Sequence, residues 1–171
     1  MGGGQVYASP IHVHENRLLF VGMVSWHEHD DDFAHVEQKW KDRDWGTYLY
    51  AMRPDGFVYL RTRAKYGLIR TKAVVPQGGD LTVNTRTAPS GHVKVAVLDT
   101  SHKPLPNYTL EDAIPVTGDA LAGTVRWRER KNLDELKGKS VLLEVHVREG
   151  ELYALRFPYR VHLGEHVCDR L

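Results

Sequence analysis

Ser90-Gly-His-Val-Lys-Val-Ala-Val-Leu-Asp-Thr100 is the stretch of the sequence that decides the fold. Its valines, Val93, Val95 and Val97, alternate with polar or small residues. A β-strand with one packed face and one solvated face produces this period of two, because successive side chains point to opposite faces. The stretch therefore predicts a strand that contributes its valines to a core.

Similar short apolar runs recur on both sides of this stretch, between Leu81 and Phe157, with turn residues between them. Evenly spaced short strands with turn signals are typical of a β-sandwich or barrel. We therefore expect an all-β chain that forms a jelly-roll-like antiparallel β-sandwich. Further strands are expected at 81–84, 123–128, 140–148 and 151–157, with a loop at 85–89 and a hairpin turn at Glu149-Gly150.

The N-terminal part of the chain has a different pattern. Two apolar pieces, 5–14 and 17–25, flank Glu15-Asn16, which predicts a hairpin with a tight turn, and Pro10 makes its first strand an edge strand. Residues 26–46 are polar and rich in charge and aromatics, without a strand period, so we expect a long loop. The expected organisation is an N-terminal hairpin and polar loop at 1–46, a β-sandwich at 47–157 and a C-terminal tail at 158–171.

Composition narrows the classes of protein to consider. The chain has 171 residues, enough for one domain with a real core. It carries 23 basic and 22 acidic residues, a net charge of +1, which gives no reason to expect a nucleic-acid or membrane partner. Cys168 is the single cysteine, so no disulfide can form within the chain. No signal peptide and no apolar run of membrane length are visible, which suits a cytoplasmic protein or a part of a secreted one.

The polar loop at 26–45 contains the first candidate site, a set of possible metal ligands. Histidine and carboxylate side chains suit zinc, and a run of carboxylates suits calcium. The spacing matches no named metal motif such as His-Glu-x-x-His, so a solvated loop with incidental histidines stays open as the alternative. The candidate ligands of this divalent metal are His27, His29, Asp31 and His35.

Aromatic residues in and next to the same loop form the second candidate site. Flat rings beside polar side chains suit sugar recognition, because a pyranose packs its C–H face on a ring while polar groups bind its hydroxyls. The alternative is that the rings belong to the core or to a contact between subunits. The candidate carbohydrate-binding residues are Trp26, Trp40, Trp45, Tyr48 and Tyr50.

A series of short motifs resembles a known module. The motifs include Arg53-Pro-Asp-Gly-Phe57, Gly91-His-Val-Lys-Val-Ala-Val-Leu-Asp99 and Leu152-Tyr-Ala-Leu-Arg-Phe157. In this order they resemble the C-terminal β-sandwich of uncharacterised bacterial proteins in the five-bladed β-propeller glycosidase superfamily, which includes fructan hydrolases and arabinanases. The resemblance covers about 110 of the 171 residues, and residues 6–29 resemble the last propeller strands of those proteins.

This resemblance implies a sugar-related context, but it does not imply hydrolysis by this chain. The family's catalytic carboxylates lie in the propeller, and the 46 residues before Thr47 are too few to form five blades. We therefore predict a non-catalytic carbohydrate-binding or accessory sandwich. One alternative is a small metal- or carboxylate-dependent glycoside hydrolase that uses the 26–45 loop. Another is an assembly fragment that forms a homo-oligomer or completes a propeller carried by a partner chain.

Overall fold

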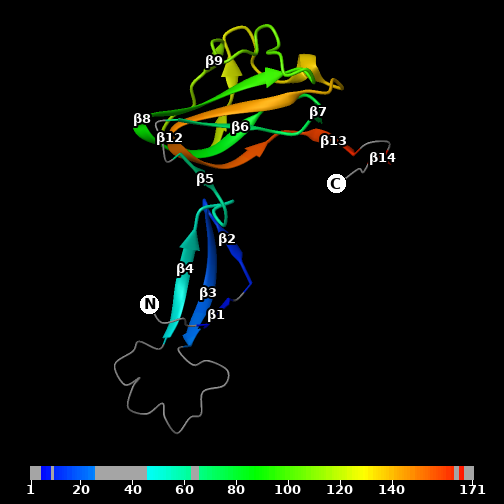
Figure 1. Cartoon of the computed structure of the whole chain (residues 1–171). Coiled ribbons are helices and arrows are strands. Elements are labelled where there is room, and N and C mark those ends of the chain that lie inside the picture. The colour runs from blue at the N-terminus through cyan, green and yellow to red at the C-terminus, as the bar shows by residue number, and fades with distance from the viewer. Residues whose placement is uncertain (1–4, 9, 26–45, 63–65, 164–165, 168–171) are drawn as a thin grey trace. The chain divides into compact units, whose positions relative to one another are not determined.

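The computed structural model describes residues 5–8, 10–25, 46–62, 66–163 and 166–167 (Figure 1). Apart from one short 3₁₀ helix, the regular elements of these residues are β-strands, and their pairings are antiparallel. The prediction of an all-β, antiparallel, sandwich-like fold is confirmed. Within the described residues, no helix has the length and apolar character needed to cross a bilayer. The chain divides into two compact units, residues 1–56 and 57–171.

The N-terminal unit is a small sheet built around β3. Its strands are β1 (Gln5–Ala8), β2 (His12–His14), β3 (Arg17–Ser25) and β4 (Gly46–Met52). Both β1 and β2 pair with β3, at its C-terminal and N-terminal halves, so they form one edge strand that is interrupted around Pro10. The turn between β2 and β3 falls at Glu15-Asn16, with a φ of 50° at Glu15. The predicted hairpin is confirmed.

Strand β4 occupies the other edge of this sheet, where Tyr50 lies opposite Phe20 of β3 and the two rings stack with centroids 5.2 Å apart. The sequence placed residues 47–52 at the start of the sandwich, whereas the structure pairs them with β3. A long connection between two neighbouring strands hid this pairing from the sequence pattern. The division between the units accordingly lies after Gly56 and not after residue 46.

The described residues of the C-terminal unit form ten further strands and the 3₁₀ helix, and β8 and β12 are by far the longest of these elements. These two strands pair with each other from Leu98 and Leu142 at one end to Thr82 and Arg156 at the other. The elements are β5 (Leu60–Arg61), β6 (Tyr66–Arg70), β7 (Val74–Pro76), β8 (Thr82–Leu98), β9 (Ala113–Ile114), β10 (Asp119–Thr124), β11 (Arg126–Trp127), η2 (Asp134–Leu136), β12 (Leu142–Arg156), β13 (Tyr159–Leu163) and β14 (His166–Val167).

Strands β8 and β12 each run through positions where the sequence predicted a break. The prediction of a loop at 85–89 is wrong, and so is that of a hairpin turn at Glu149-Gly150. The register between the two strands shifts at these positions, because residues 88–91 of β8 lie opposite the single residue Glu149 of β12. Extra residues in one strand bend it, and Figure 1 shows the paired strands folding back on themselves here. The predicted turn residues therefore mark a bend that both strands share.

Gly91 allows the two strands to approach each other at this bend. A Cβ atom at this position would lie 2.5 Å from the carbonyl oxygen of Glu149 and 2.6 Å from that of Arg148. These distances are too short for any side chain. Glu149 itself has a φ of 45°, so the bend also constrains the opposing strand.

The two halves of the folded-back ribbon enclose the core. Val93, Val95 and Val97 are fully buried, which confirms the prediction made from their alternation. Trp127 lies among them, where its Nε1 donates a hydrogen bond to the carbonyl of Val95 at 2.8 Å and its ring meets Tyr108 edge-on at 4.9 Å. The other buried members of this cluster include Leu81, Val83, Val125, Leu133, Val141, Leu143, Val145, Val147 and Leu152.

The segment that follows the predicted sandwich continues it. The sequence assigned residues 158–171 to a tail outside the core, but β13 pairs with β7, with Tyr159 opposite Pro76 and Val161 opposite Val74. The short strand β14 then pairs with β13. The C-terminal unit therefore extends beyond the boundary at residue 157.

Candidate functional site

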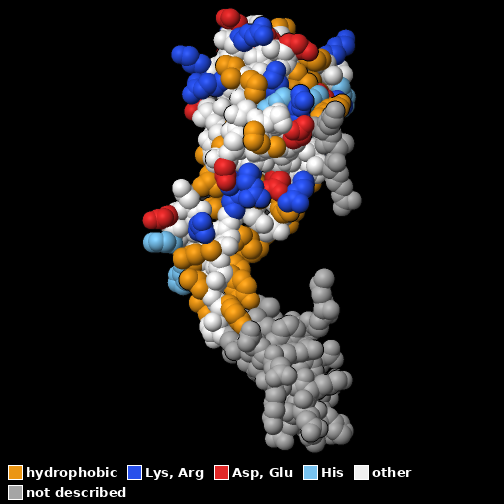
Figure 2. Space-filling view, turned by 90° about the vertical axis from the view of Figure 1, so that its left-hand side faces the viewer, with side chains coloured by type: hydrophobic (Ala, Val, Ile, Leu, Met, Phe, Trp, Pro, Cys, Tyr) orange, Lys and Arg blue, Asp and Glu red, His pale blue; other side chains and the backbone are white. Residues whose placement is uncertain are grey.

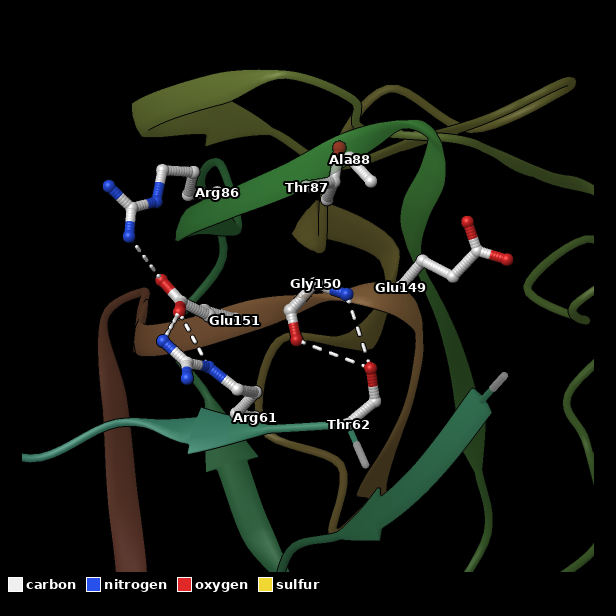
Figure 3. A pocket seen from close by; sticks show the side chains of 8 residues that line it. All are labelled: Arg61, Thr62, Arg86, Thr87, Ala88, Glu149, Gly150 and Glu151. Atoms are coloured by element: carbon white, nitrogen blue, oxygen red, sulfur yellow. Dashed lines mark hydrogen bonds and ion pairs between the residues drawn. The ribbon is translucent and has the colours of Figure 1, made fainter. Parts of the chain in front are cut away.

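Three charged side chains lie in a row across three neighbouring strands of the C-terminal unit. Glu151 of β12 is directly opposite Arg61 of β5 on one side and Arg86 of β8 on the other. Directly opposite residues on one face of a sheet have Cβ atoms about 5 Å apart, so their side chains meet. Figure 3 shows the two guanidinium groups on either side of the carboxylate. We call Arg61, Glu151 and Arg86 the charge row.

The Glu151 carboxylate is almost completely buried and both of its oxygens accept hydrogen bonds. Arg61 donates to Oε1 through Nε at 2.8 Å and also through Nη2. Arg86 Nη2 donates to Oε2 at 3.0 Å, and the Tyr153 hydroxyl donates to the same oxygen. Glu151 is only 6% exposed, whereas the side chains of Arg61 and Arg86 are 58% and 57% exposed. The negative charge of the row is therefore buried, and its two positive charges are exposed to solvent.

These contacts keep Glu151 ionised. Burial alone would raise the pKa of the carboxyl, but the hydrogen bonds from Tyr153 and Arg61 and the charges of both arginines outweigh it and lower the pKa below its usual value. The Arg61 pKa is raised, first by its hydrogen bond to Glu151. At neutral pH Glu151 has no proton to give, so it cannot act as a general acid.

An aromatic pair lies beside the charge row, with Tyr59 immediately before β5 and Tyr153 on β12. The rings of Tyr59 and Tyr153 are 5.3 Å apart between centroids, and the Arg61 guanidinium lies 5.3 Å from the centre of the Tyr59 ring. Tyr59 is among the exposed large hydrophobic residues of the chain. An open ring next to charged groups offers both an apolar surface and hydrogen-bond partners.

The charge row borders a pocket of about 330 Å³, near the small end of the range for ligand pockets. One of its lining residues is Gly150, whose N–H donates to Thr62 Oγ1 at 3.2 Å and whose carbonyl accepts from Thr62 N at 3.1 Å. A Cβ at Gly150 would approach Thr87 Cγ2 to 3.0 Å, so a side chain there would press on β8. The lining residues are Arg61, Thr62, Arg86, Thr87, Ala88, Glu149, Gly150 and Glu151 (Figure 3).

The second carboxylate of the pocket, Glu149, does not face the first. Figure 3 shows its carboxylate pointing away from Glu151, and it accepts a hydrogen bond from the Ser90 hydroxyl. Glycosidases use two carboxylates that flank the scissile bond. The residues that line this pocket do not present such a pair.

The predicted aromatic site is only partly covered by the structure. Tyr48 and Tyr50 lie on β4 in the N-terminal unit, with ring centroids 6.4 Å apart. Trp26, Trp40 and Trp45 lie outside the described residues. The structure therefore brings together only the two tyrosines of this predicted set.

The predicted metal ligands, His27, His29, Asp31 and His35, also lie outside the described residues. Within the part of the chain that the structure describes, no three histidine, cysteine or carboxylate side chains are grouped so that they could hold a metal. The metal site in the 26–45 loop stays a prediction.

Sequence reasoning missed the charge row and the aromatic pair. The signal was present as two short alternations, Tyr59 with Arg61 and Glu151 with Tyr153, each of which places a ring and a charge on one face of a strand. Only the strand register shows that these alternations are neighbours, with Arg61 opposite Glu151.

No family model, curated protein or solved structure matches this chain. The resemblance to the propeller glycosidase module stays a prediction. The pocket and its charge row are what the described residues offer as a site, and their chemistry is that of binding: exposed cationic donors, an exposed ring and a carboxylate fixed as an anion.

Proposed function

We propose that the C-terminal unit is a non-catalytic carbohydrate-binding module whose ligand occupies the pocket beside the charge row. The observation that carries the proposal is the solvent-facing Arg61 guanidinium, which lines the pocket and lies 5.3 Å from the centre of the exposed Tyr59 ring beside it. Sugar rings pack their C–H face on such a ring while charged groups bind their hydroxyls. The volume of about 330 Å³ suits a ligand of small size, such as one sugar unit.

The state of Glu151 supports binding over hydrolysis in this pocket. Its two oxygens are occupied by hydrogen bonds from Arg61, Arg86 and Tyr153, so it is not free to act as a nucleophile. Its lowered pKa removes it as a proton donor at neutral pH. A carboxylate held in this way instead serves as the partner of the two arginines beside the pocket.

Isothermal titration calorimetry of the full chain with a panel of monosaccharides and short oligosaccharides tests the proposal. We expect saturable binding that weakens roughly tenfold in Tyr59→Ala, the order expected for losing a ring contact. Tyr66→Ala is the matched control, because Tyr66 is also exposed but lies on β6 and stacks on His146, whereas Tyr59 adjoins the lining residue Arg61. The absence of binding to any sugar, or an equal effect of the two variants, would contradict the proposal.

A second function is favoured by the N-terminal sheet, which has apolar side chains on both faces. Leu49 is 69% exposed on one face and Val13 is 76% exposed on the other, and Figure 2 shows hydrophobic side chains gathered over this unit. Small sheets need one face packed on further structure to be stable, and exposed apolar patches mark interaction sites. We propose that this sheet is an assembly element that packs against β-structure of another chain or a second copy.

Light scattering of the full chain tests the assembly role. We expect self-association, or capture of an added partner, that falls in Leu49→Lys. Lys is chosen because a charge on this face opposes burial. Ile114→Lys, at an exposed apolar position in the C-terminal unit, is the control and is expected to leave association unchanged. A chain that stays monomeric and does not bind a hydrophobic dye would contradict this second role.

A further inference from the structure

We infer that the pocket selects a ligand that carries a carboxylate, such as a uronic acid unit, and that Glu151 competes with this ligand for the arginine donors. The inference rests on the proposed function, because it specifies the class of sugar that the pocket takes. It follows from the balance of hydrogen-bond donors and acceptors around the pocket.

Donors are in excess at the mouth of the pocket. Each guanidinium has more N–H groups than its bonds to Glu151 use. Among the described residues, Arg61 Nη1 and the Nε and Nη1 atoms of Arg86 have no hydrogen-bond partner. Both side chains are more than half exposed, so these donors are open to a ligand.

Three side-chain acceptors of the same pocket already accept hydrogen bonds from the protein. Thr87 Oγ1 accepts from the Gly118 N–H at 2.9 Å, and Thr62 Oγ1 accepts from the Gly150 N–H at 3.2 Å. Glu149 accepts from the Ser90 hydroxyl. A neutral sugar needs acceptors for its hydroxyl hydrogens, whereas a carboxylate needs only donors. The pocket therefore matches an acceptor-rich ligand better than a neutral one.

Charge favours the same class of ligand. Two arginines and one glutamate leave the charge row with one positive charge in excess, and Asp119, which lies opposite Arg86 on β10, offsets part of it on the Arg86 side, so the excess is concentrated at Arg61. Glu149 offsets little of it at the ligand position, because its carboxylate points away from Glu151 and lies 3.9 Å from Arg148 Nε. The planar guanidinium matches a carboxylate with two parallel hydrogen bonds, a geometry that a hydroxyl cannot offer.

Titration of the full chain with glucuronate and galacturonate, and with glucose and galactose as their neutral counterparts, tests the inference. We expect the uronates to bind about tenfold more tightly or better, the order of a charge-assisted hydrogen bond. Because the arginines are exposed, we also expect this preference to shrink as salt is raised.

Two variants are expected to change uronate affinity in opposite directions. Arg86→Met removes one exposed set of donors and lowers the affinity by roughly tenfold. Glu151→Gln replaces the competing carboxylate with a neutral amide and raises the affinity. Simple damage to the fold would lower both, and circular dichroism checks that each variant is folded. Arg70→Met is the matched control, since Arg70 pairs with Glu144 elsewhere on β12 and is expected to leave affinity unchanged.

The outcomes separate the inference from the function it rests on. Equal affinity for uronates and neutral sugars would overturn carboxylate selection and leave the proposed function standing. Equal affinity for uronates and acetate would overturn the carbohydrate function and keep carboxylate selection. If neither sugars nor carboxylates bind, both the carbohydrate function and the carboxylate selection are overturned. If uronate affinity falls in a folded Glu151→Gln variant, the competing role of Glu151 is overturned.

Discussion

Glu151 has a structural effect that can be measured apart from any ligand. It is a buried carboxylate whose oxygens hold two exposed arginines and a tyrosine hydroxyl in fixed positions. Removing the charge of one member of a buried, hydrogen-bonded group leaves its partners without a strong acceptor. The residue therefore links the stability of the sandwich to the shape of the pocket.

We predict that Glu151→Gln lowers the free energy of unfolding at neutral pH by about 1–3 kcal/mol. The pKa of Glu151 is lower in the folded state than in the unfolded state, so its contribution is present above the unfolded pKa. This contribution is lost as pH falls below about 4.3 and through the folded pKa. Urea denaturation of both proteins at several pH values measures it, and the variant should lose less stability in acid. Parallel pH profiles would contradict the role given to Glu151.

Gly91 and Gly118 are glycines for two different reasons, a close approach of neighbouring backbone at Gly91 and a positive φ at Gly118. We predict that Gly91→Ala lowers the free energy of unfolding by about 1–3 kcal/mol, because its Cβ would press on two carbonyl oxygens. Gly118 has a φ of 78° and no heavy atom within 4 Å of its Cβ position, so Gly118→Ala should cost only about 1 kcal/mol for backbone strain. Thermal unfolding compares the two. A Gly91→Ala variant as stable as the parent would refute the close approach at the bend.

At the scale of elements, the sequence predicts the strands well and their continuity poorly. The alternation of Val93, Val95 and Val97 identifies a half-buried strand without any knowledge of its partners. Pro89 and Gly150, in contrast, signal a turn, and the structure uses them in a bend shared by two paired strands. Local residues cannot distinguish a loop from such a bend, because the difference depends on which residues lie opposite.

Trp127 joins the short strand β11 to the central ribbon. We predict that Trp127→Phe lowers the free energy of unfolding by about 2–4 kcal/mol, from lost packing against Tyr108 and the lost hydrogen bond to Val95. Chemical denaturation followed by far-ultraviolet circular dichroism measures the change. Arg126→Ala, at the exposed neighbouring position on β11, is the control and should have little effect. Equal midpoints for the two variants would contradict the central place of Trp127.

At the scale of the whole molecule, the candidate site could not be predicted from the sequence. The clustered aromatic and potential metal-binding residues of the sequence lie in the 26–45 loop, which is outside the described residues. The charge row joins residues 61, 86 and 151, which are far apart in the chain and meet only through strand pairing. Composition and motif spacing carry no information on such a register.

The main buried apolar core belongs to the C-terminal unit, so we expect this unit to fold when it is separated from the N-terminal unit. The buried members of the main core cluster lie between Val74 and Leu152, within the C-terminal unit. We predict that residues 57–171 alone fold and unfold cooperatively, with a urea midpoint close to that of the same transition in the full chain. Circular dichroism and amide NMR spectra check this. A fragment with no cooperative transition would show that the C-terminal core is insufficient.

Carbohydrate binding at the charge row can be followed residue by residue in an NMR titration of the ¹⁵N-labelled full chain with glucuronate. The Nε–H signals of Arg61 and Arg86 and the amide signals of Thr62, Thr87 and Gly150 report on the pocket. We predict saturable shifts that are largest at these groups and smaller with glucose. Unchanged Arg61 and Arg86 signals at saturating glucuronate, or shifts centred on Tyr48 and Tyr50 instead, would contradict it.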